Sequence, residues 1–216
     1  MAFVKDFMTR NPQTVSPDSK VSDAVKAMAD KNVGSLLVVD KGRMKGILTE
    51  RDLLSKVLDL GKSPETTTVA SVMSSPVAEV QPTASLKKAA EAMTSRKNRL
   101  VVVDRGRPEG ILTATDIVRA IYKQGSPFDP SKTITRKIIT VNPETSIRDV
   151  VGIMSRKRVG SVIVAKNGKP LGIFTERDLV KKVLSPHLSM DKHVGDVATR
   201  QLIIAGKIRM GKVPQR

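Results

Sequence analysis

Apolar and polar residues alternate along this chain in one pattern that occurs three times. Each copy contains four apolar positions spaced i, i+3, i+4 and i+7, the stripe by which an amphipathic helix packs on a core. The three stripes are Val21, Ala24, Val25 and Met28; Leu86, Ala89, Ala90 and Met93; and Ile147, Val150, Val151 and Met154. The pattern predicts three equivalent helices. Ser146, with Asp149 three residues later, predicts an N-cap for the last of them.

Each stripe is followed by a short apolar run rich in β-branched residues, and each run by a dipeptide that ends in glycine. The runs lie at 36–39, 100–103 and 162–165, and the dipeptides at 41–42, 105–106 and 167–168. Such runs indicate buried strands. The dipeptides favour hairpin turns, because these turns need positive φ and glycine adopts it at little steric cost.

The strand after each hairpin enters the same seven-residue motif, Gly-h-h-Thr-x-x-Asp, where h is hydrophobic. The three copies lie at 46–52, 110–116 and 172–178, which is 64 and 62 residues apart. A second helix is expected after each motif, at 53–58, 117–122 and 179–184, and a short strand ending at Pro17, Pro82 or Pro143 opens each copy. Three copies in phase predict tandem β-α-β-β-α units, an α+β fold.

The repeat divides the chain into four segments. We expect residues 1–64, 65–130 and 131–190 to form repeats 1, 2 and 3, and residues 191–216 to be a fragment of a fourth repeat with a basic tail. In that fragment Val194–Val197 echoes the start of repeat 1, and Leu202–Ala205 is expected to be its first strand. Two helices cover one face of a small sheet, so we expect repeats 1 and 2 to pair through their other faces.

Composition excludes several classes of protein. The 216 residues include no cysteine, which rules out disulfides, a thiolate metal site and a cysteine nucleophile. No apolar stretch approaches the roughly 18 residues of a membrane span, and no secretion signal opens the chain, so we expect a cytoplasmic protein without membrane association. His187 and His193 lack metal-ligand spacing, and no catalytic motif is present, so no enzymatic activity is expected.

Positive charge accumulates toward the end of the chain. Residues 131–216 carry 18 lysine and arginine side chains against 6 aspartate and glutamate side chains, within a net charge of +17 for the whole chain. Such a surface attracts anions, whether nucleotides, nucleic acid or an acidic protein. The five aromatic residues offer few stacking platforms for bases, and no helix-turn-helix pattern is present. Nucleic-acid binding is therefore kept as an alternative function.

With these motifs the chain resembles the CBS domain family, named after cystathionine β-synthase. The resemblance rests on the three Gly-h-h-Thr-x-x-Asp turns, on the Val-Val-Asp runs at 38–40 and 102–104, and on the pairs Met8-Thr9 and Met73-Ser74. It covers about residues 3–185, with Ile134 in place of the third methionine. The family pairs two repeats into a pseudo-twofold (Bateman) module that binds AMP, ADP, ATP or S-adenosylmethionine in clefts between repeats. The resemblance implies a regulatory nucleotide sensor that is not a catalyst and requires no cofactor.

Thr49 and Asp52 of the first motif have a binding interpretation and a structural one. A carboxylate can accept both ribose hydroxyls, a threonine hydroxyl can donate to a phosphate oxygen, and a helix start favours phosphate. The same Thr-x-x-Asp spacing is also a good helix N-cap. The resemblance implies nucleotide binding at Thr49 and Asp52 and, by the same logic, at Thr113, Asp116, Thr175 and Asp178.

Arg99 breaks the symmetry of the repeats, because serine stands at the equivalent positions Ser35 and Ser161. The resemblance implies that a basic residue here reaches phosphate across the pseudo-twofold axis, in one site with Thr49 and Asp52. A guanidinium suits phosphate because its charge is permanent and its donors form a fork. A solvated arginine beside Lys97 is the alternative.

The adenine of such a ligand would need an apolar slot and backbone amides. The resemblance implies that six residues flanking the first helix of repeat 1 are candidates: Thr14, Val15, Pro17, Val33, Gly34 and Ser35. The valines are equally typical of a core, and Gly34 either permits close approach of a ligand or serves a turn.

Repeat 3 has no complete partner repeat in this sequence. Its uncovered sheet face would be an exposed apolar patch, which predicts a homodimer. A scaffold that binds a protein partner through repeat 3 and the tail is a further alternative.

Overall fold

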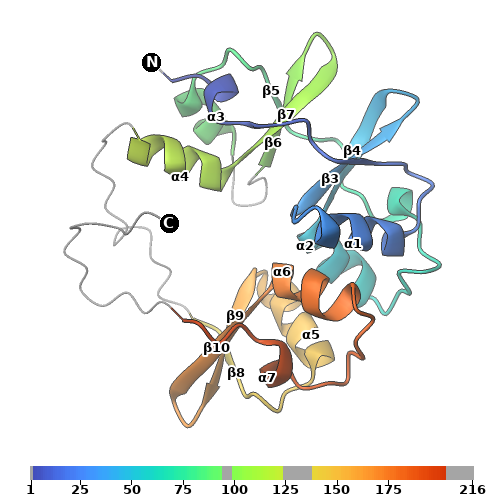
Figure 1. Cartoon of the computed structure of the whole chain (residues 1–216), viewed down its shortest axis with the longest axis vertical. Helices are drawn as coiled ribbons and strands as arrows, with labels where there is room; N and C mark the ends of the chain where they lie inside the picture. The colour runs from blue at the N-terminus through green and yellow to red at the C-terminus, as the bar shows by residue number, and fades with distance from the viewer. Residues whose placement is uncertain (1, 94–98, 124–137, 203–216) are drawn as a thin grey trace.

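The computed structural model describes residues 2–93, 99–123 and 138–202. Three sheets, each with its own helices, follow one another around the molecule in the order repeat 2, repeat 1, repeat 3 (Figure 1). The α+β fold of repeated β-α-β-β-α units that the sequence predicts is confirmed.

Repeat 1 shows how the apolar pattern builds one unit. Its sheet contains β2 (Thr14–Val15), β3 (Ser35–Asp40) and β4 (Arg43–Thr49), with β2 parallel and β4 antiparallel to the central β3. Helix α1 (Val21–Asp30) buries its predicted stripe in the core of this repeat. A short helix, α2 (Glu50–Asp52), follows β4 and continues into the π-helical turn η2 (Leu53–Leu58).

Repeats 2 and 3 contain equivalent elements, except that repeat 2 ends in one regular helix where repeats 1 and 3 have a short helix and a π-helical turn. Repeat 2 comprises β5 (Glu79–Val80), α3 (Leu86–Ala92), β6 (Arg99–Asp104), β7 (Arg107–Thr113) and α4 (Ala114–Lys123). Repeat 3 comprises β8 (Thr140–Val141), α5 (Ile147–Lys157), β9 (Ser161–Lys166), β10 (Lys169–Thr175), α6 (Glu176–Asp178) and the π-helical turn η5 (Leu179–Leu184). The hydroxyl oxygen of Ser146 accepts the Asp149 N–H at 3.1 Å, so the predicted cap of α5 is present.

The opening segments of repeats 1 and 2 are exchanged. The 3-10 turn η1 (Val4–Asp6) and strand β1 (Thr9–Arg10) belong to repeat 1 in sequence, but β1 pairs with β7 of repeat 2. The 3-10 turn η3 (Val69–Ser71) of repeat 2 leads to Ser74, which exchanges backbone hydrogen bonds of 2.8 and 3.0 Å with Ile47 of repeat 1. The exchange ties the two repeats together in both directions.

The segment after repeat 3 lies on the sheet of repeat 3 in the same manner. Helix α7 (Val194–Val197) precedes Thr199, which exchanges backbone hydrogen bonds of 2.8 and 2.9 Å with Ile173. Residues 203–205 of the strand expected at 202–205, the rest of the basic tail and Ile134 lie outside the described residues.

This crossing explains the glycine that opens each motif. A Cβ atom on Gly46, Gly110 or Gly172 would lie 2.8–2.9 Å from a backbone oxygen of the segment that crosses the sheet there. Real Cβ atoms do not approach backbone that closely, so a side chain at these positions would push the crossing segment away.

Repeats 1 and 2 pair through their sheets. Equivalent residues from the two sheets form one buried cluster: Leu37 and Ile47 from repeat 1, and Val101 and Ile111 from repeat 2. This is the pseudo-twofold pairing that the sequence predicts. The equivalent residues of repeat 3, Ile163 and Ile173, are only partly buried in the described part of the chain.

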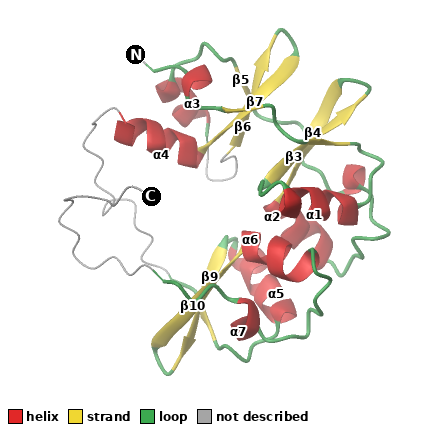
Figure 2. Ribbon diagram, viewed as in Figure 1, coloured by secondary structure: helices red, strands yellow, loops and turns green. Residues whose placement is uncertain are grey.

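Repeats 1 and 3 pair through their helices, which lie between the two sheets in Figure 2. Leu54 of repeat 1 is 0% exposed within the core of repeat 3, and the equivalent Val180 of repeat 3 is 2% exposed within the core of repeat 1. Val118 occupies the same position in repeat 2 and is 47% exposed. Each core is therefore completed by a residue of the other repeat.

Candidate functional site

Each Thr-x-x-Asp motif forms a capping box at the start of a helix, in which the threonine and the aspartate hydrogen-bond to each other. In repeat 1 the backbone N–H and the hydroxyl of Thr49 donate to Asp52 Oδ2 at 2.9 and 2.6 Å. The Asp52 N–H donates back to the Thr49 hydroxyl oxygen at 3.2 Å. The same three bonds join Thr113 to Asp116 and Thr175 to Asp178, with lengths of 2.6–3.4 Å. The N-cap that the spacing predicts is present in all three repeats.

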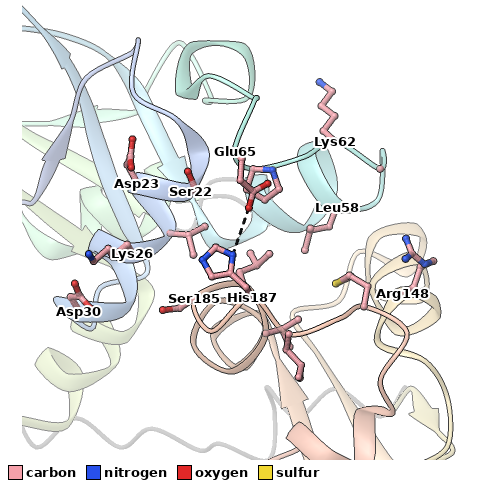
Figure 3. Close-up of a pocket in the computed structure, with 17 residues that line it drawn as sticks. Ser22, Asp23, Lys26, Asp30, Leu58, Lys62, Glu65, Arg148, Ser185 and His187 are labelled. Carbon is pink, nitrogen blue, oxygen red and sulfur yellow. Dashed lines mark ion pairs between the residues drawn. The ribbon is translucent and has the colours of Figure 1, made fainter.

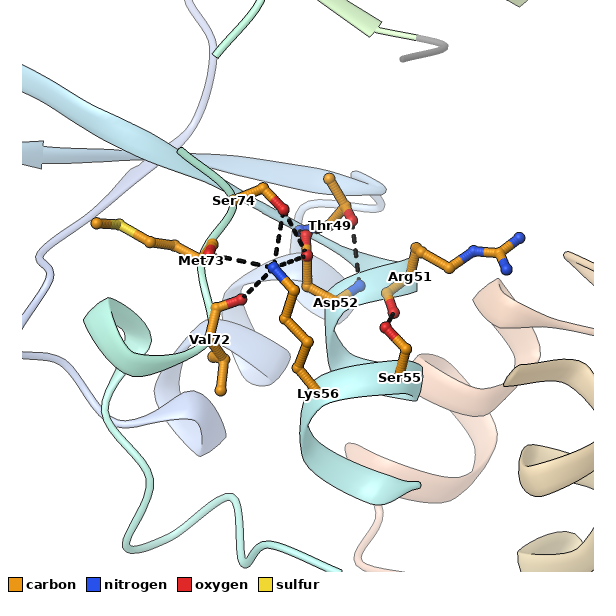
Figure 4. A network of polar contacts seen from close by, with 8 residues as sticks. All are labelled: Thr49, Arg51, Asp52, Ser55, Lys56, Val72, Met73 and Ser74. Atoms are coloured by element: carbon orange, nitrogen blue, oxygen red, sulfur yellow. Dashed lines mark hydrogen bonds and ion pairs between the residues drawn. The ribbon is translucent and has the colours of Figure 1, made fainter. Parts of the chain in front are cut away.

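The second oxygen of Asp52 holds the segment that crosses from repeat 2 (Figure 4). Oδ1 accepts the Ser74 hydroxyl at 2.7 Å and lies 2.7 Å from Lys56 Nζ. The Lys56 ammonium also donates to the backbone oxygens of Val72 and Met73 at 3.0 and 3.2 Å. The carboxylate thus acts on the helix start and on the contact between repeats at once.

Asp178 has the same arrangement in repeat 3. Its Oδ1 accepts the Thr199 hydroxyl at 2.9 Å and lies 2.8 Å from Lys182 Nζ. Burial acts to raise the pKa of this carboxyl, but the hydrogen bonds from Lys182, Thr175 and Thr199 outweigh it and hold the pKa below its usual value. Asp178 is therefore a structural anion at neutral pH.

Asp116 of repeat 2 is held by fewer contacts. Ala120 stands where repeats 1 and 3 carry a lysine, and the nearest cation to Oδ1 is the exposed Arg119, at 3.6 Å. Among the described residues, Asp116 is the one motif aspartate whose Oδ1 receives no hydrogen bond. Within the part of the chain that the structure describes, the second oxygens of Asp52 and Asp178 both have hydroxyl donors, and that of Asp116 has none.

Arg99 begins β6 and is directed across the pseudo-twofold axis at the motif of repeat 1. Its Nη2 lies 3.9 Å from Oε2 of Glu50, the residue after Thr49, and its side chain is 21% exposed. Gly34 lies against both groups, since a Cβ there would be 2.9 Å from Arg99 Nη2 and from Glu50 Oε2. The structure thus brings Arg99 to the Thr49–Asp52 turn, with Glu50 as its contact.

The turns of repeats 1 and 3 exchange ion pairs. Arg177 of repeat 3 donates through Nε to Glu50 Oε1 at 3.3 Å, and Arg51 of repeat 1 places its Nε 2.6 Å from Glu176 Oε1. The Nε–H group of Arg51 does not point at Glu176 Oε1, so this oxygen is buried without a hydrogen bond. Burial raises the pKa of Glu176 above its usual value although Arg51 opposes the shift.

The adenine candidates of repeat 1 lie in different surroundings. Val15 and Val33 pack against the core of repeat 1. The Gly34 oxygen accepts the Glu50 N–H at 3.2 Å. The other three lie on or beside β2 and β3: Thr14 is exposed, Pro17 is partly buried, and Ser35 is buried opposite Thr49.

A cavity of about 800 Å³ lies away from these turns, on the outer side of the contact between repeats 1 and 3 (Figure 3). It is lined by α1, the loop at 61–65, η5 and the loop that follows it, where His187 Nδ1 lies 3.7 Å from Glu65 Oε1. Within the residues described, no group of three potential metal ligands is present. Nor does this part of the chain contain a helix of the length and hydrophobicity that crossing a membrane requires.

Part of the positive charge of repeat 3 is paired. Arg148 lies 3.1 Å from Asp191, and Lys166 lies 2.7 Å from Glu144. Nucleic-acid binding stays a prediction.

The sequence interpretation missed the charged residues that join repeats. The signal was present: repeats 1 and 3 both carry Glu-Arg after the motif threonine, at 50–51 and 176–177, while repeat 2 carries Ala-Thr at 114–115. The same two repeats carry Lys56 and Lys182 where repeat 2 has alanine. Shared departures of this kind mark the two repeats that face each other.

Comparison with known proteins decides the family. The CBS domain profile matches residues 4–59, 69–123 and 132–185. The chain belongs to the CBS domain family. A relative, the uncharacterized protein MJ1404 of Methanocaldococcus jannaschii, is 32% identical over 194 residues, which make up 87% of this chain and 45% of that protein. The chain thus spans less than half the length of that relative.

Solved structures agree with the CBS fold. The crystal structure of MJ1225 from Methanocaldococcus jannaschii superposes with a TM-score of 0.80 at 20% identity, over 94% of this chain and 84% of that one. A crystal structure of CBSX2 in complex with AMP has a TM-score of 0.50 at 31% identity, over 58% of this chain and 99% of that one.

Proposed function

We propose that this CBS protein is a regulatory sensor that binds an adenine nucleotide between repeats 1 and 2. The observation that carries the proposal is the position of Arg99, a partly exposed guanidinium that reaches from repeat 2 to the Thr49–Asp52 turn of repeat 1. CBSX2, which is 31% identical, was crystallised with AMP. An arginine fork at a helix start suits a phosphate group.

The internal contacts of the aspartates bear on where a ribose binds. A carboxylate offers about four acceptor positions, and Asp52 already receives the Thr49 N–H and hydroxyl, the Ser74 hydroxyl and the Lys56 ammonium. A ribose at Asp52 would take the place of Ser74 or Lys56, whereas Asp116 offers its Oδ1. The phosphate is therefore assigned to Arg99, and Asp52 and Asp116 are the two candidate ribose acceptors.

Isothermal titration with AMP, ADP, ATP and S-adenosylmethionine tests the proposal. We expect micromolar binding of at least one of them, weakened about tenfold or more by Arg99→Gln, because a charged hydrogen bond contributes about 1.5–3 kcal/mol. Arg107→Gln removes an exposed arginine of β7, in the same repeat, as the matched control. Adenosine lacks the phosphate, so its affinity should not change in Arg99→Gln. Absence of binding by all four ligands would contradict the proposal.

We further propose that the protein acts as a homodimer in the cytoplasm, without catalytic activity of its own, and controls a protein partner. Val118, Ile163 and Ile173 support the dimer, because their equivalents in the other repeats are buried between repeats. Light scattering at micromolar concentration tests it, and a stable monomer would contradict it.

A further inference from the structure

Glu50 is a buried carboxylate that two other repeats share. It belongs to repeat 1, its Oε2 faces Arg99 of repeat 2 at 3.9 Å, and its Oε1 accepts a hydrogen bond from Arg177 of repeat 3 at 3.3 Å. The Glu50 carboxylate therefore contacts both the arginine that binds nucleotide in the proposed function and an arginine of repeat 3.

The two contacts differ in strength. The Arg177 contact is a hydrogen bond, whereas the Arg99 contact is long and has no hydrogen-bond geometry. A buried carboxylate needs at least one cation to offset its lost hydration. Arg177 can meet that need alone, so Arg99 is the partner that can leave.

The surroundings of Glu50 favour a phosphate that replaces this carboxylate at Arg99 over a phosphate that binds beside it. Arg99 Nη2 and Glu50 Oε2 both press against Gly34, as the 2.9 Å distances to a Cβ there show. A phosphate that binds this guanidinium would lie beside the Glu50 carboxylate, and two anions so close repel each other strongly.

Glu176 is the matched comparison in repeat 3. It lies beside Arg51 of repeat 1, as Glu50 lies beside Arg177 of repeat 3. Arg99 acts on Glu176 at longer range, but no ion pair joins the two among the described residues, and the nearest side-chain atom to a Cβ on Gly160 would be 3.8 Å away. Glu176 joins two repeats, and Glu50 joins three.

We propose that the phosphate of a bound nucleotide displaces Glu50 from Arg99, and that the released carboxylate then binds Arg177 alone. Nucleotide binding between repeats 1 and 2 thereby strengthens the contact between repeats 1 and 3. The inference rests on the proposed function for its ligand, and it assigns Glu50 the role of a positioning residue that couples the two interfaces.

The first test follows AMP binding and hydrogen exchange together. In the wild-type protein AMP should slow exchange of the amides at 176–184, next to Arg177. In Glu50→Gln, AMP should bind about three- to tenfold more tightly, because no carboxylate opposes the phosphate, but exchange at 176–184 should no longer respond. Glu176→Gln changes the matched carboxylate of the same interface, which forms no ion pair with Arg99 among the described residues, so it should keep the response.

The second test needs no ligand. Arg99→Met, Arg177→Met and the double variant are compared by urea unfolding. If the two arginines share Glu50, the double variant loses more stability than the two single variants combined, because only the double variant leaves Glu50 buried without either arginine. In the Glu50→Gln background the two losses should add.

The outcomes separate this inference from the proposed function. Additive losses with Glu50 present, or an unchanged exchange response in Glu50→Gln despite bound AMP, would overturn the inference and leave the proposed function standing. No binding of AMP, ADP, ATP or S-adenosylmethionine by wild-type protein or Glu50→Gln would overturn the proposed function and the displacement step with it. Glu50 would then remain a shared structural anion if the cycle is non-additive.

Discussion

At the scale of single residues, buried carboxylates hold this protein's repeats together. Asp52 and Asp178 each cap a helix with one oxygen and hold a crossing segment with the other. Glu50 and Glu176 join the turns of repeats 1 and 3. Hydrogen bonds to Asp178 hold the pKa of its carboxyl below the usual value, so ionisation of Asp178 is part of the stability of the fold.

The pH dependence of stability tests the raised pKa of Glu176. The folded protein binds this proton more tightly than the unfolded chain, so ionised Glu176 costs stability above the folded pKa, and the cost disappears as pH falls through that pKa. Glu176→Gln removes the cost. We expect the stability of this variant relative to wild type to be greater at about pH 7 than at about pH 5, near the usual glutamate pKa.

Urea midpoints at the two pH values measure this difference. Glu65→Gln is a control whose pH dependence has the opposite sign. A hydrogen bond from Ser63 lowers the Glu65 pKa, so ionised Glu65 stabilises the folded protein, and this stabilisation is lost as pH falls. An advantage of Glu176→Gln that shrinks toward pH 7 would contradict the assignment.

At the scale of elements, the segments that cross the sheets explain why each motif begins with glycine. β1 lies on repeat 2, Ser74 on repeat 1 and Thr199 on repeat 3, each over a glycine that has no room for a side chain. The antiparallel strand pair within each repeat is a local hairpin, whereas each crossing joins that hairpin to a segment outside it. The motif glycine is thus a mark of contact between segments.

Gly172→Ala tests this explanation. Its Cβ would lie 2.9 Å from the Thr199 backbone oxygen, so we expect a loss of about 1–3 kcal/mol in the free energy of unfolding. Gly160→Ala in the same repeat is the control, because its Cβ would find ordinary contacts at 3.8 Å and should change stability by less than about 0.5 kcal/mol. Urea unfolding of both variants measures the difference, and equal effects would refute the explanation.

At the scale of the whole molecule, repeat 1 is central. It pairs with repeat 2 through its sheet and with repeat 3 through its helices. Leu54 and Val180 are each buried in the core of the other repeat, so this part of the helix contact between repeats 1 and 3 is as well buried as a domain interior. A change in one repeat is expected to reach its neighbours.

Leu54→Ala should destabilise repeat 3 although the residue belongs to repeat 1. We expect a loss of about 2–5 kcal/mol, since a fully buried leucine leaves a cavity, together with faster hydrogen exchange in α5. Leu60→Ala changes an exposed leucine of the same repeat and should cost less than about 0.5 kcal/mol. Undisturbed exchange in α5 of Leu54→Ala would show that the two cores are independent.

The sequence by itself determined the repeat, its elements and the caps. Apolar periodicity, hairpin dipeptides and the Thr-x-x-Asp spacing act over a few residues, so they specify helices, strands and turns before any tertiary contact forms. Sequence comparison among the three copies also singled out Arg99, because it departs from Ser35 and Ser161.

Only the tertiary structure decided which repeat receives each opening segment, that repeats 1 and 3 meet through their helices, and that Arg99 contacts Glu50. These features join residues distant in sequence, and their free energy comes from burial and charge pairing between separate units. No local pattern records such a partner. A carboxylate like Glu50 acquires its role from the two arginines that the fold brings to it.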